Sequence, residues 1–169
     1  DYLLGDYKNA KQLLDKVSES KHKDYFLGKT LKAMGLYEQA IELFRKAALE
    51  MDLPATAELE RVSCQILSKR FEDASSSLKN LGKALKDKNA EYHYQLGRLN
   101  EDIGDYDGAI SNYEKAISLD EHHIESMFAM AYMFDLHGND SLALDYYKAT
   151  TKINPLHINT LLNMCVIYE

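Results

Sequence analysis

A pattern of small and aromatic residues recurs in this chain at a spacing of about 34 residues, within the range of known repeat proteins. It is clearest in residues 90–123, and it returns in residues 124–157. The corresponding pairs are Gly97 and Ala131, Gly104 and Gly138, Ala109 and Ala143, and Tyr113 and Tyr147. Periods of roughly 20 to 50 residues are typical of proteins that stack one small unit many times, because a single unit cannot bury its own apolar face. The period therefore predicts a repeat array.

The residue types in the pattern indicate pairs of antiparallel helices in close contact. One position in the first helix of a pair is small, as at Gly28, Gly97 and Ala131. An Ala near the start of each second helix is the other small residue, and these are Ala40, Ala74, Ala109 and Ala143. Small side chains let two helix backbones approach each other, and the aromatic residue four positions after the Ala fills the remaining space.

This pattern resembles the tetratricopeptide repeat (TPR), a two-helix unit of about 34 residues with Leu-Gly, Tyr, Ala, Phe and Pro at set positions. The resemblance implies an all-α fold, a right-handed superhelical solenoid of antiparallel helix pairs. Proteins of this family usually act as non-catalytic scaffolds, so the resemblance implies that a protein or peptide is the partner.

The pattern divides the chain into six segments. We expect the second helix of an incomplete repeat in residues 1–20, four repeats in residues 21–55, 56–89, 90–123 and 124–157, and the first helix of an incomplete fifth repeat in residues 158–169. They would form a single repeat domain, cut from a larger protein at both ends. Pro54 is placed at the end of the first repeat, since Pro cannot continue a helix. In the second repeat, the turn at residues 68–70 lacks Gly and is one residue short, and Ser63 takes the small position.

Charge and cysteine content restrict the partners and the compartment. A net charge of −7 and a pI near 5.4 argue against direct binding of nucleic acid, which needs excess Lys and Arg on one face. Lys79, Lys83 and Lys86 form a basic stripe that we interpret as a solvated helix face. No apolar run approaches the roughly 20 residues that span a bilayer, so we expect a soluble protein without a membrane partner. Cys64 and Cys165 suit packing positions in a reducing compartment, which predicts a cytoplasmic protein.

Two short segments resemble metal sites, and each has a simpler explanation. Residues 104–114 place Asp and Glu at several positions of a calcium loop, but the first ligand position is Ile103, which has no carboxylate. His122 and His123 lie near two Glu residues, yet adjacent residues point in different directions and no HExxH motif accompanies them. We interpret both segments as turns of the repeat. The sequence also has no GxSxG motif and no phosphate-binding Gly loop, so we predict no catalytic activity, metal or cofactor.

The family resemblance implies a concave groove lined by the first helix of every unit. Carried over position by position, it assigns six main residues to a peptide-binding groove: Tyr25, Lys29, Tyr94, Arg98, Phe128 and Tyr132. Further groove positions are His22, Lys32, Ala57, Glu60, Cys64, Leu67, Glu91, Glu101, Glu125, Asp135, Asn159 and Leu162. A second interpretation of each aromatic residue, packing against the neighbouring helix, is equally open.

Some members of the family hold the terminal carboxylate of a chaperone peptide with Lys and Asn side chains. Here Tyr25 and Lys29, or Tyr94 and Arg98, stand where that clamp begins with Lys and Asn, so the match fails. The residues favour an extended or helical peptide with apolar anchors and an acidic group that contacts Arg98 or Lys29.

A second hypothesis is a self-association or spacer module of a larger bacterial regulatory protein. Residues 24–47 and 142–169 resemble repeat regions of bacterial proteins that carry a domain like the C-terminal part of the RNA polymerase alpha subunit. That resemblance implies a link to transcription. Apolar faces on the end helices would then allow a homo-oligomer to form.

Overall fold

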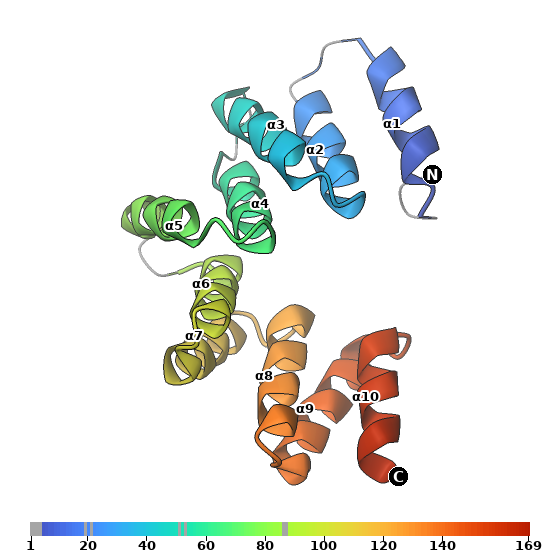
Figure 1. Ribbon diagram of the computed structural model, residues 1–169, viewed down its shortest axis with the longest axis vertical. Helices are drawn as coiled ribbons and strands as arrows, with labels where there is room; N and C mark the ends of the chain where they lie inside the picture. The colour runs from blue at the N-terminus through green and yellow to red at the C-terminus, as the bar shows by residue number, and fades with distance from the viewer. Residues whose placement is uncertain (1–4, 19, 21, 51, 53, 86–87) are drawn as a thin grey trace. The chain divides into compact units, whose positions relative to one another are not determined.

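The computed structural model describes residues 5–18, 20, 22–50, 52, 54–85 and 88–169. Within these residues it contains ten α-helices and no β-strand, which confirms the all-α prediction (Figure 1). The helices are α1 (Tyr7–Lys16), α2 (Lys23–Ala33), α3 (Tyr37–Glu50), α4 (Pro54–Leu67), α5 (Phe71–Leu85), α6 (Ala90–Asp102), α7 (Tyr106–Leu119), α8 (Ile124–Leu136), α9 (Asp140–Ile153) and α10 (Ile158–Tyr168). The predicted start of the first repeat at Lys21 and the last residue of the basic stripe, Lys86, lie outside the described residues.

The chain forms two compact units, residues 1–86 and residues 87–169. Unit 1 contains α1 to α5, and unit 2 contains α6 to α10. Within each unit, every helix packs against the next one along the chain. Following the predicted pairing, we call α2, α4, α6, α8 and α10 the first helices and the others the second helices. The repeat boundaries themselves stay predictions.

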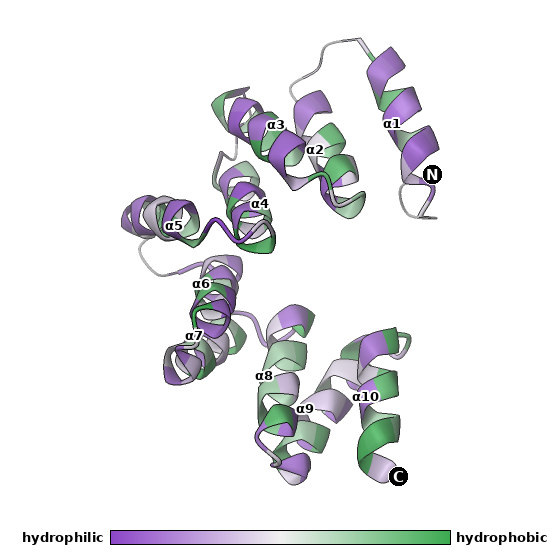
Figure 2. Cartoon of the chain, in the orientation of Figure 1, coloured by the Kyte–Doolittle hydropathy of each residue, from purple (hydrophilic) through white to green (hydrophobic). Residues whose placement is uncertain are grey.

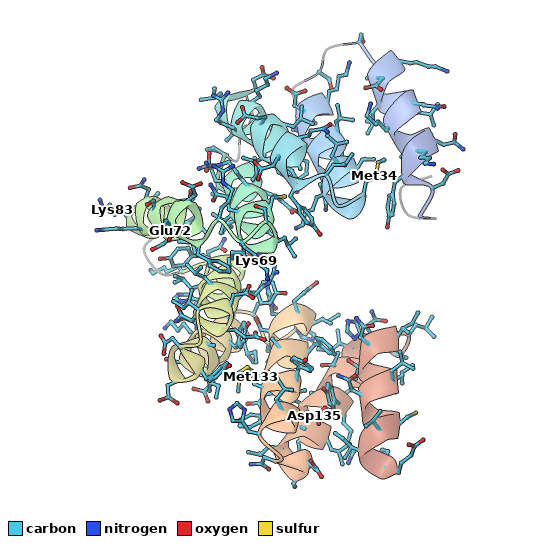
Figure 3. The ribbon with its side chains drawn as sticks, in the orientation of Figure 1. Met34, Lys69, Glu72, Lys83, Met133 and Asp135 are labelled. Carbon is cyan, nitrogen blue, oxygen red and sulfur yellow. The ribbon has the colours of Figure 1, made fainter. Side chains whose placement is uncertain are left out.

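A residue with a left-handed backbone lies in the turn after each of the first helices α2, α4, α6 and α8. Gly35, Gly104 and Gly138 have φ angles of +75°, +84° and +70°. Lys69 takes this place between α4 and α5, with a φ of +60° (Figure 3). All four turns have the same length, so the prediction of a short turn at residues 68–70 is wrong. Lys69 replaces Gly without a change of length, in a region of backbone space that suits Gly better.

Backbone hydrogen bonds close these turns in the same way in both units. The N–H of Arg70 donates to the carbonyl of Gln65 at 2.8 Å, and the N–H of Asp105 donates to the carbonyl of Asn100 at 2.8 Å. This is the longer bond of a Schellman motif, which satisfies a carbonyl at the end of a helix. The second repeat therefore keeps the turn of the other repeats although its sequence differs.

Complementary side-chain sizes hold the two helices of a pair together. A Cβ atom on Gly97 would lie 2.5 Å from the ring of Tyr113, so only Gly fits without a shift. In the second repeat, the residues at the same spacing are Val62 and Leu78, and both are fully buried. At this spacing α4 has a residue larger than Gly and α5 has one smaller than Tyr, so the two positions differ less in size than Gly97 and Tyr113 do. Val62 takes the small position, and the assignment of that position to Ser63 is wrong.

Helix α4 begins at Pro54, whereas the repeat pattern predicts this residue at the end of the preceding repeat. Pro suits the first turn of a helix, because the N–H that it lacks would have no partner there. The helix therefore begins before the predicted repeat boundary.

Hydropathy differs among the helices (Figure 2). The sequence of α10 contains no charged residue, whereas α1 is mostly hydrophilic. None of the described helices is both long enough and apolar enough to cross a membrane.

Candidate protein-binding face

Four of the six predicted groove residues lie on the first helices of unit 2. Tyr94 and Arg98 come from α6, and Phe128 and Tyr132 come from α8; we call these four residues the unit 2 face. Tyr94, Arg98 and Phe128 are half-buried, and Tyr132 is 39% exposed. Each therefore keeps surface that a partner could contact, as a place in a binding groove requires.

Tyr94 is held by rings on two neighbouring elements. Its ring centroid lies 6.0 Å from that of Tyr113 on α7 and 5.3 Å from that of His123, which precedes α8. The guanidinium of Arg98 lies 5.8 Å from the Tyr94 ring, within the range of a cation–π contact. Burial raises the pKa of Tyr94 to about 12, while the charge of Arg98 lowers it in part and nearby carboxylates raise it. The phenol is therefore neutral and fixed in place.

Phe128 repeats this arrangement one repeat later. Its ring centroid lies 5.9 Å from that of Tyr147 on α9 and 5.1 Å from that of His157, which precedes α10. It also stacks with Tyr132, with the ring centroids 6.4 Å apart. Tyr94 and Phe128 thus each pack against a second helix and against the cap of the next first helix, and each keeps an exposed part. Binding of a partner by these residues stays a prediction.

The two histidines beside these rings cap the next first helix. Nδ1 of His123 accepts a hydrogen bond from the N–H of Ser126 at 3.2 Å, and Nδ1 of His157 accepts one from the N–H of Thr160 at 3.4 Å. Asn89 caps α6 in the same way. Such caps satisfy amide groups that have no partner within the helix. The imidazoles therefore fix the start of α8 and α10 against the aromatic residues of the preceding first helix.

His123 also connects α8 to α6 through Glu91. Its Nε2 lies 3.4 Å from a carboxylate oxygen of Glu91, and Gln95 donates to the other oxygen at 2.6 Å. Burial lowers the pKa of His123, but the hydrogen bond and charge of Glu91, with Glu125 and Asp120 nearby, raise it to a net value above its ordinary one. The described residues contain no group of three or more His, Cys, Asp or Glu side chains that could hold a metal ion.

Two tyrosines on second helices bind acidic groove candidates. The hydroxyl of Tyr113 donates to Glu101 at 2.6 Å, and the hydroxyl of Tyr147 donates to Asp135 at 3.2 Å. Asn163 on α10 donates to the Tyr147 hydroxyl at 2.7 Å. Glu101 and Asp135 thus serve the packing of helix pairs, a role that the repeat pattern does not predict.

Burial is the largest cause of the altered titration of these phenols. It raises the pKa of Tyr147 to about 12, and the hydrogen bond with Asn163 opposes this while Asp135 adds to it. Burial also raises the pKa of Tyr113, together with the charge and hydrogen bond of Glu101. Both hydroxyls therefore remain hydrogen-bond donors throughout the neutral range.

In unit 1, the predicted groove residues Tyr25 and Lys29 lie together on α2. The ammonium of Lys29 is 5.9 Å from the Tyr25 ring and 3.7 Å from a carboxylate oxygen of Glu60 on α4. Lys32 donates to the other oxygen of Glu60 at 2.8 Å. Much of the positive charge predicted for this face is thus paired with Glu60.

The second repeat contributes less to a binding face than predicted. Ala57 and Cys64 are both fully buried. Cys64 belongs to the core cluster with Leu31, Ile41 and Phe44. The assignment of Ala57 and Cys64 to an open groove is therefore wrong. Neither Cys64 nor Cys165 forms a disulfide bond.

A cavity of about 530 Å³ lies elsewhere on unit 2, with polar side chains from α6 and α7. Its lining residues are His93, Ser111, Asn112, Glu114, Lys115 and Ser118. His93 is buried and lies 3.2 Å from Asn112. The cavity shares no residue with the unit 2 face.

Comparison with known families shows a helical-repeat protein. Residues 2–153 match a family model described as Nucleoporin Nup120, HEAT repeats. Photosystem I assembly protein Ycf3 of Prochlorococcus marinus is 34% identical over 99 residues, which are 57% of this chain and 57% of that protein. The chain spans about half the length of the curated relatives that it matches.

Solved structures confirm the tetratricopeptide resemblance and the fold. TTC0263 of Thermus thermophilus, described as a thermophilic TPR protein, matches with a TM-score of 0.84 and 20% identity over 99% of this chain and 93% of its own. YrrB, described as a TPR protein with an unusual peptide-binding site, matches with a TM-score of 0.59 and 18% identity over 95% of this chain and 84% of its own. At these identities the likeness concerns the fold.

Proposed function

This chain belongs to the helical-repeat family described as Nucleoporin Nup120, HEAT repeats, and we propose that it is a non-catalytic scaffold that binds a protein segment on the unit 2 face. One observation carries the proposal. Aromatic residues at equivalent places on α6 and α8 are fixed by the histidine rings that precede the next first helix and yet remain partly exposed. Rigid, amphipathic aromatic residues are typical anchors of protein interfaces, because they gain contact area at little cost in conformational entropy.

Related proteins support a role in protein interaction. The Ycf3 relatives are named for the assembly of photosystem I, and YrrB is described as having a peptide-binding site. For this chain we propose only the shared feature, binding of another protein by a stack of helix pairs. We also propose a reducing compartment, the cytoplasm, where the buried thiol of Cys64 and the exposed thiol of Cys165 would both remain reduced.

The proposal is tested with variants of Tyr132, since its side chain is more exposed than that of Tyr94 or Phe128 and its removal disturbs the core least. Tyr132→Ala should weaken capture of a native partner by about tenfold, the usual effect of losing an aromatic anchor. The matched control is Tyr106→Ala, which removes a tyrosine that is 49% exposed on the second helix α7. Equal capture by both variants and the unaltered chain would show that the unit 2 face is not the binding surface.

Self-association is a second candidate, favoured by the exposure of apolar residues on α10. Leu162 is 59% exposed and Val166 is 71% exposed. Exposed apolar surface of this kind is typical of interaction sites. Sedimentation at increasing concentration should then give a rising mass, which Val166→Lys abolishes. A constant monomer mass would exclude this candidate.

A further inference from the structure

Two residues of α10, Leu162 and Val166, extend the unit 2 face, and from here on the name includes them. Leu162 follows Phe128 by one repeat period, and Val166 follows Tyr132 by the same step, so they occupy equivalent places on the next first helix. Met164 and Ile167 of α10 pack against the core of the preceding pair. Because a helix turns once in about 3.6 residues, Leu162 and Val166 lie largely on the other side of α10 from Met164. The apolar surface of α10 is thus available to a partner.

The chemistry changes along these three helices. The face is charged and aromatic on α6, aromatic on α8 and aliphatic on α10. Figure 2 shows hydrophobic residues along much of α10. A single partner segment that covers all three helices would therefore meet different surroundings at its two ends.

Acidic groups dominate the charged end. The first helices of unit 2 carry five acidic residues, Glu91, Glu101, Asp102, Glu125 and Asp135, and one basic residue, Arg98. In unit 1, the first helices α2 and α4 have four basic and three acidic residues: Lys23, Lys29, Lys32, Arg61, Asp24, Glu58 and Glu60. The acidic character therefore belongs to unit 2, and it opposes the expectation that Arg98 contacts an acidic group.

Two of the carboxylates lie beside the aromatic anchor of α6. Glu125 has a side chain that is 62% exposed and lies 3.9 Å from His123, whose ring contacts Tyr94. Glu91 also lies beside His123, and its side chain is 43% exposed. A cation near Tyr94 would gain from both carboxylates, while Arg98, whose guanidinium lies 5.8 Å from the Tyr94 ring, would oppose it. An anion there would meet Arg98 but would be repelled by Glu91 and Glu125.

From this arrangement we propose that the unit 2 face binds a basic, amphipathic protein segment. Lys or Arg side chains of the segment lie beside Tyr94, Glu91 and Glu125, and its aliphatic side chains lie on Leu162 and Val166. The middle of the segment contacts the two rings of α8. The inference rests on the proposed function and defines the chemistry of its partner.

Three synthetic peptides of equal length test this inference with the whole chain. The first is an amphipathic helix with Leu on one face and Lys on the other. The second replaces every Lys by Glu, and the third replaces every Leu by Ser. Fluorescence anisotropy should show binding of the Leu/Lys peptide at least tenfold tighter than that of either other peptide. Affinity should fall as salt is added, because exposed charges are screened.

Charge variants give a second, signed test. Glu125→Gln should weaken binding of the Leu/Lys peptide by about two- to fivefold, as expected for an exposed ion pair. Arg98→Gln should strengthen it by a similar factor, since it removes a like charge beside the cation. Val166→Ser should weaken it as well. The control is Glu114→Gln, which removes an exposed carboxylate on α7 and should change nothing.

The outcomes separate this inference from the proposed function. Tighter binding of the Leu/Glu peptide, weakened by Tyr132→Ala and by Arg98→Gln, would overturn the basic partner and leave the unit 2 face as a binding surface. Binding of the Leu/Lys peptide that responds to Glu114→Gln as strongly as to Glu125→Gln would reveal attraction to net charge alone and would also overturn the inference. Failure of all three peptides to bind would refute it, while the capture experiment with Tyr132→Ala would still decide the proposed function.

Discussion

Replacing Lys69 by Gly should stabilise unit 1. Lys69 has a φ of +60° in a turn whose equivalents are Gly35, Gly104 and Gly138. The left-handed region costs a residue with a side chain about 1 to 2 kcal/mol, whereas Gly adopts it freely. Gly also has about 0.5 to 1 kcal/mol more conformational entropy to lose on folding. The difference predicts a gain of about 0.5 to 1 kcal/mol.

Hydrogen exchange is the suitable assay, because a chain of two units need not unfold in one step. Exchange of the α4 and α5 amides reports the free energy of opening the helix pair that this turn connects. Lys69→Gly should slow exchange there by about two- to fivefold, which is the predicted gain expressed as a ratio. Amides of α6 to α10 belong to the other unit and should keep their rates.

Two further variants identify the cause. Lys69→Ala retains a Cβ atom and the same backbone cost, so it should leave exchange within the error, since the Lys69 side chain is exposed. Gly104→Ala makes the reverse change in unit 2 and should cost about 1 kcal/mol, with faster exchange in α6 and α7. If Lys69→Gly failed to slow exchange, or if Lys69→Ala slowed it as much, backbone strain at this turn would not be the reason for the effect.

Three other predictions concern the contacts between helices of unit 2. Gly97→Ala should lower the free energy of unfolding, measured by urea titration, by about 1 to 3 kcal/mol, because the new Cβ would lie 2.5 Å from the buried Tyr113 ring. Unchanged stability would mean that the ring moves aside easily. Tyr113→Phe should cost about 1 to 2 kcal/mol, measured in the same way, because Glu101 loses its hydrogen bond; a neutral result would show that water replaces the hydroxyl fully. Burial raises the pKa of Tyr94 and Tyr147 to about 12, above the ordinary value near 10, so the neutral form stabilises the folded state. This stabilisation is present below pH 10 and should be lost between about pH 10 and 12, by up to about 1.4 kcal/mol per pH unit for each tyrosine. Circular dichroism reports the loss of helix, and absorbance reports the formation of tyrosinate. Tyrosinate formation at an unshifted pKa would contradict the prediction.

The helix pairs can be predicted from the sequence because their contacts depend on residue size at fixed spacing. Gly97 and Tyr113 are such a contact, and the same spacing recurs along the chain. The second repeat is harder to place, since buried residues of other sizes, Val62 and Leu78, stand at this spacing. The step from Lys69 to the next turn glycine is also one residue longer than the other steps. The register of the second repeat is therefore predicted one residue late.

The side-chain network of the unit 2 face can be predicted only in part. Its aromatic residues follow from the family pattern, but the capping role of His123 and His157 does not, because His is not among the preferred capping residues. The carboxylates that accept from Tyr113 and Tyr147 lie on the other helix of each pair. Such bonds depend on how far two helices are rotated about their axes, and the apolar pattern alone does not define this.

The unit 2 face and the stacking of its repeats depend on the same side chains. Tyr94 contacts His123, which caps α8, and Phe128 contacts His157, which caps α10. A change at either aromatic residue therefore disturbs the start of the next first helix as well as the surface offered to a partner. Tyr132 stacks on Phe128 but touches no cap among the described contacts, so it can be changed with less effect on the stack. Loss of binding in Tyr132→Ala can consequently be assigned to the face, whereas loss in Phe128→Ala cannot be separated from a displaced α10.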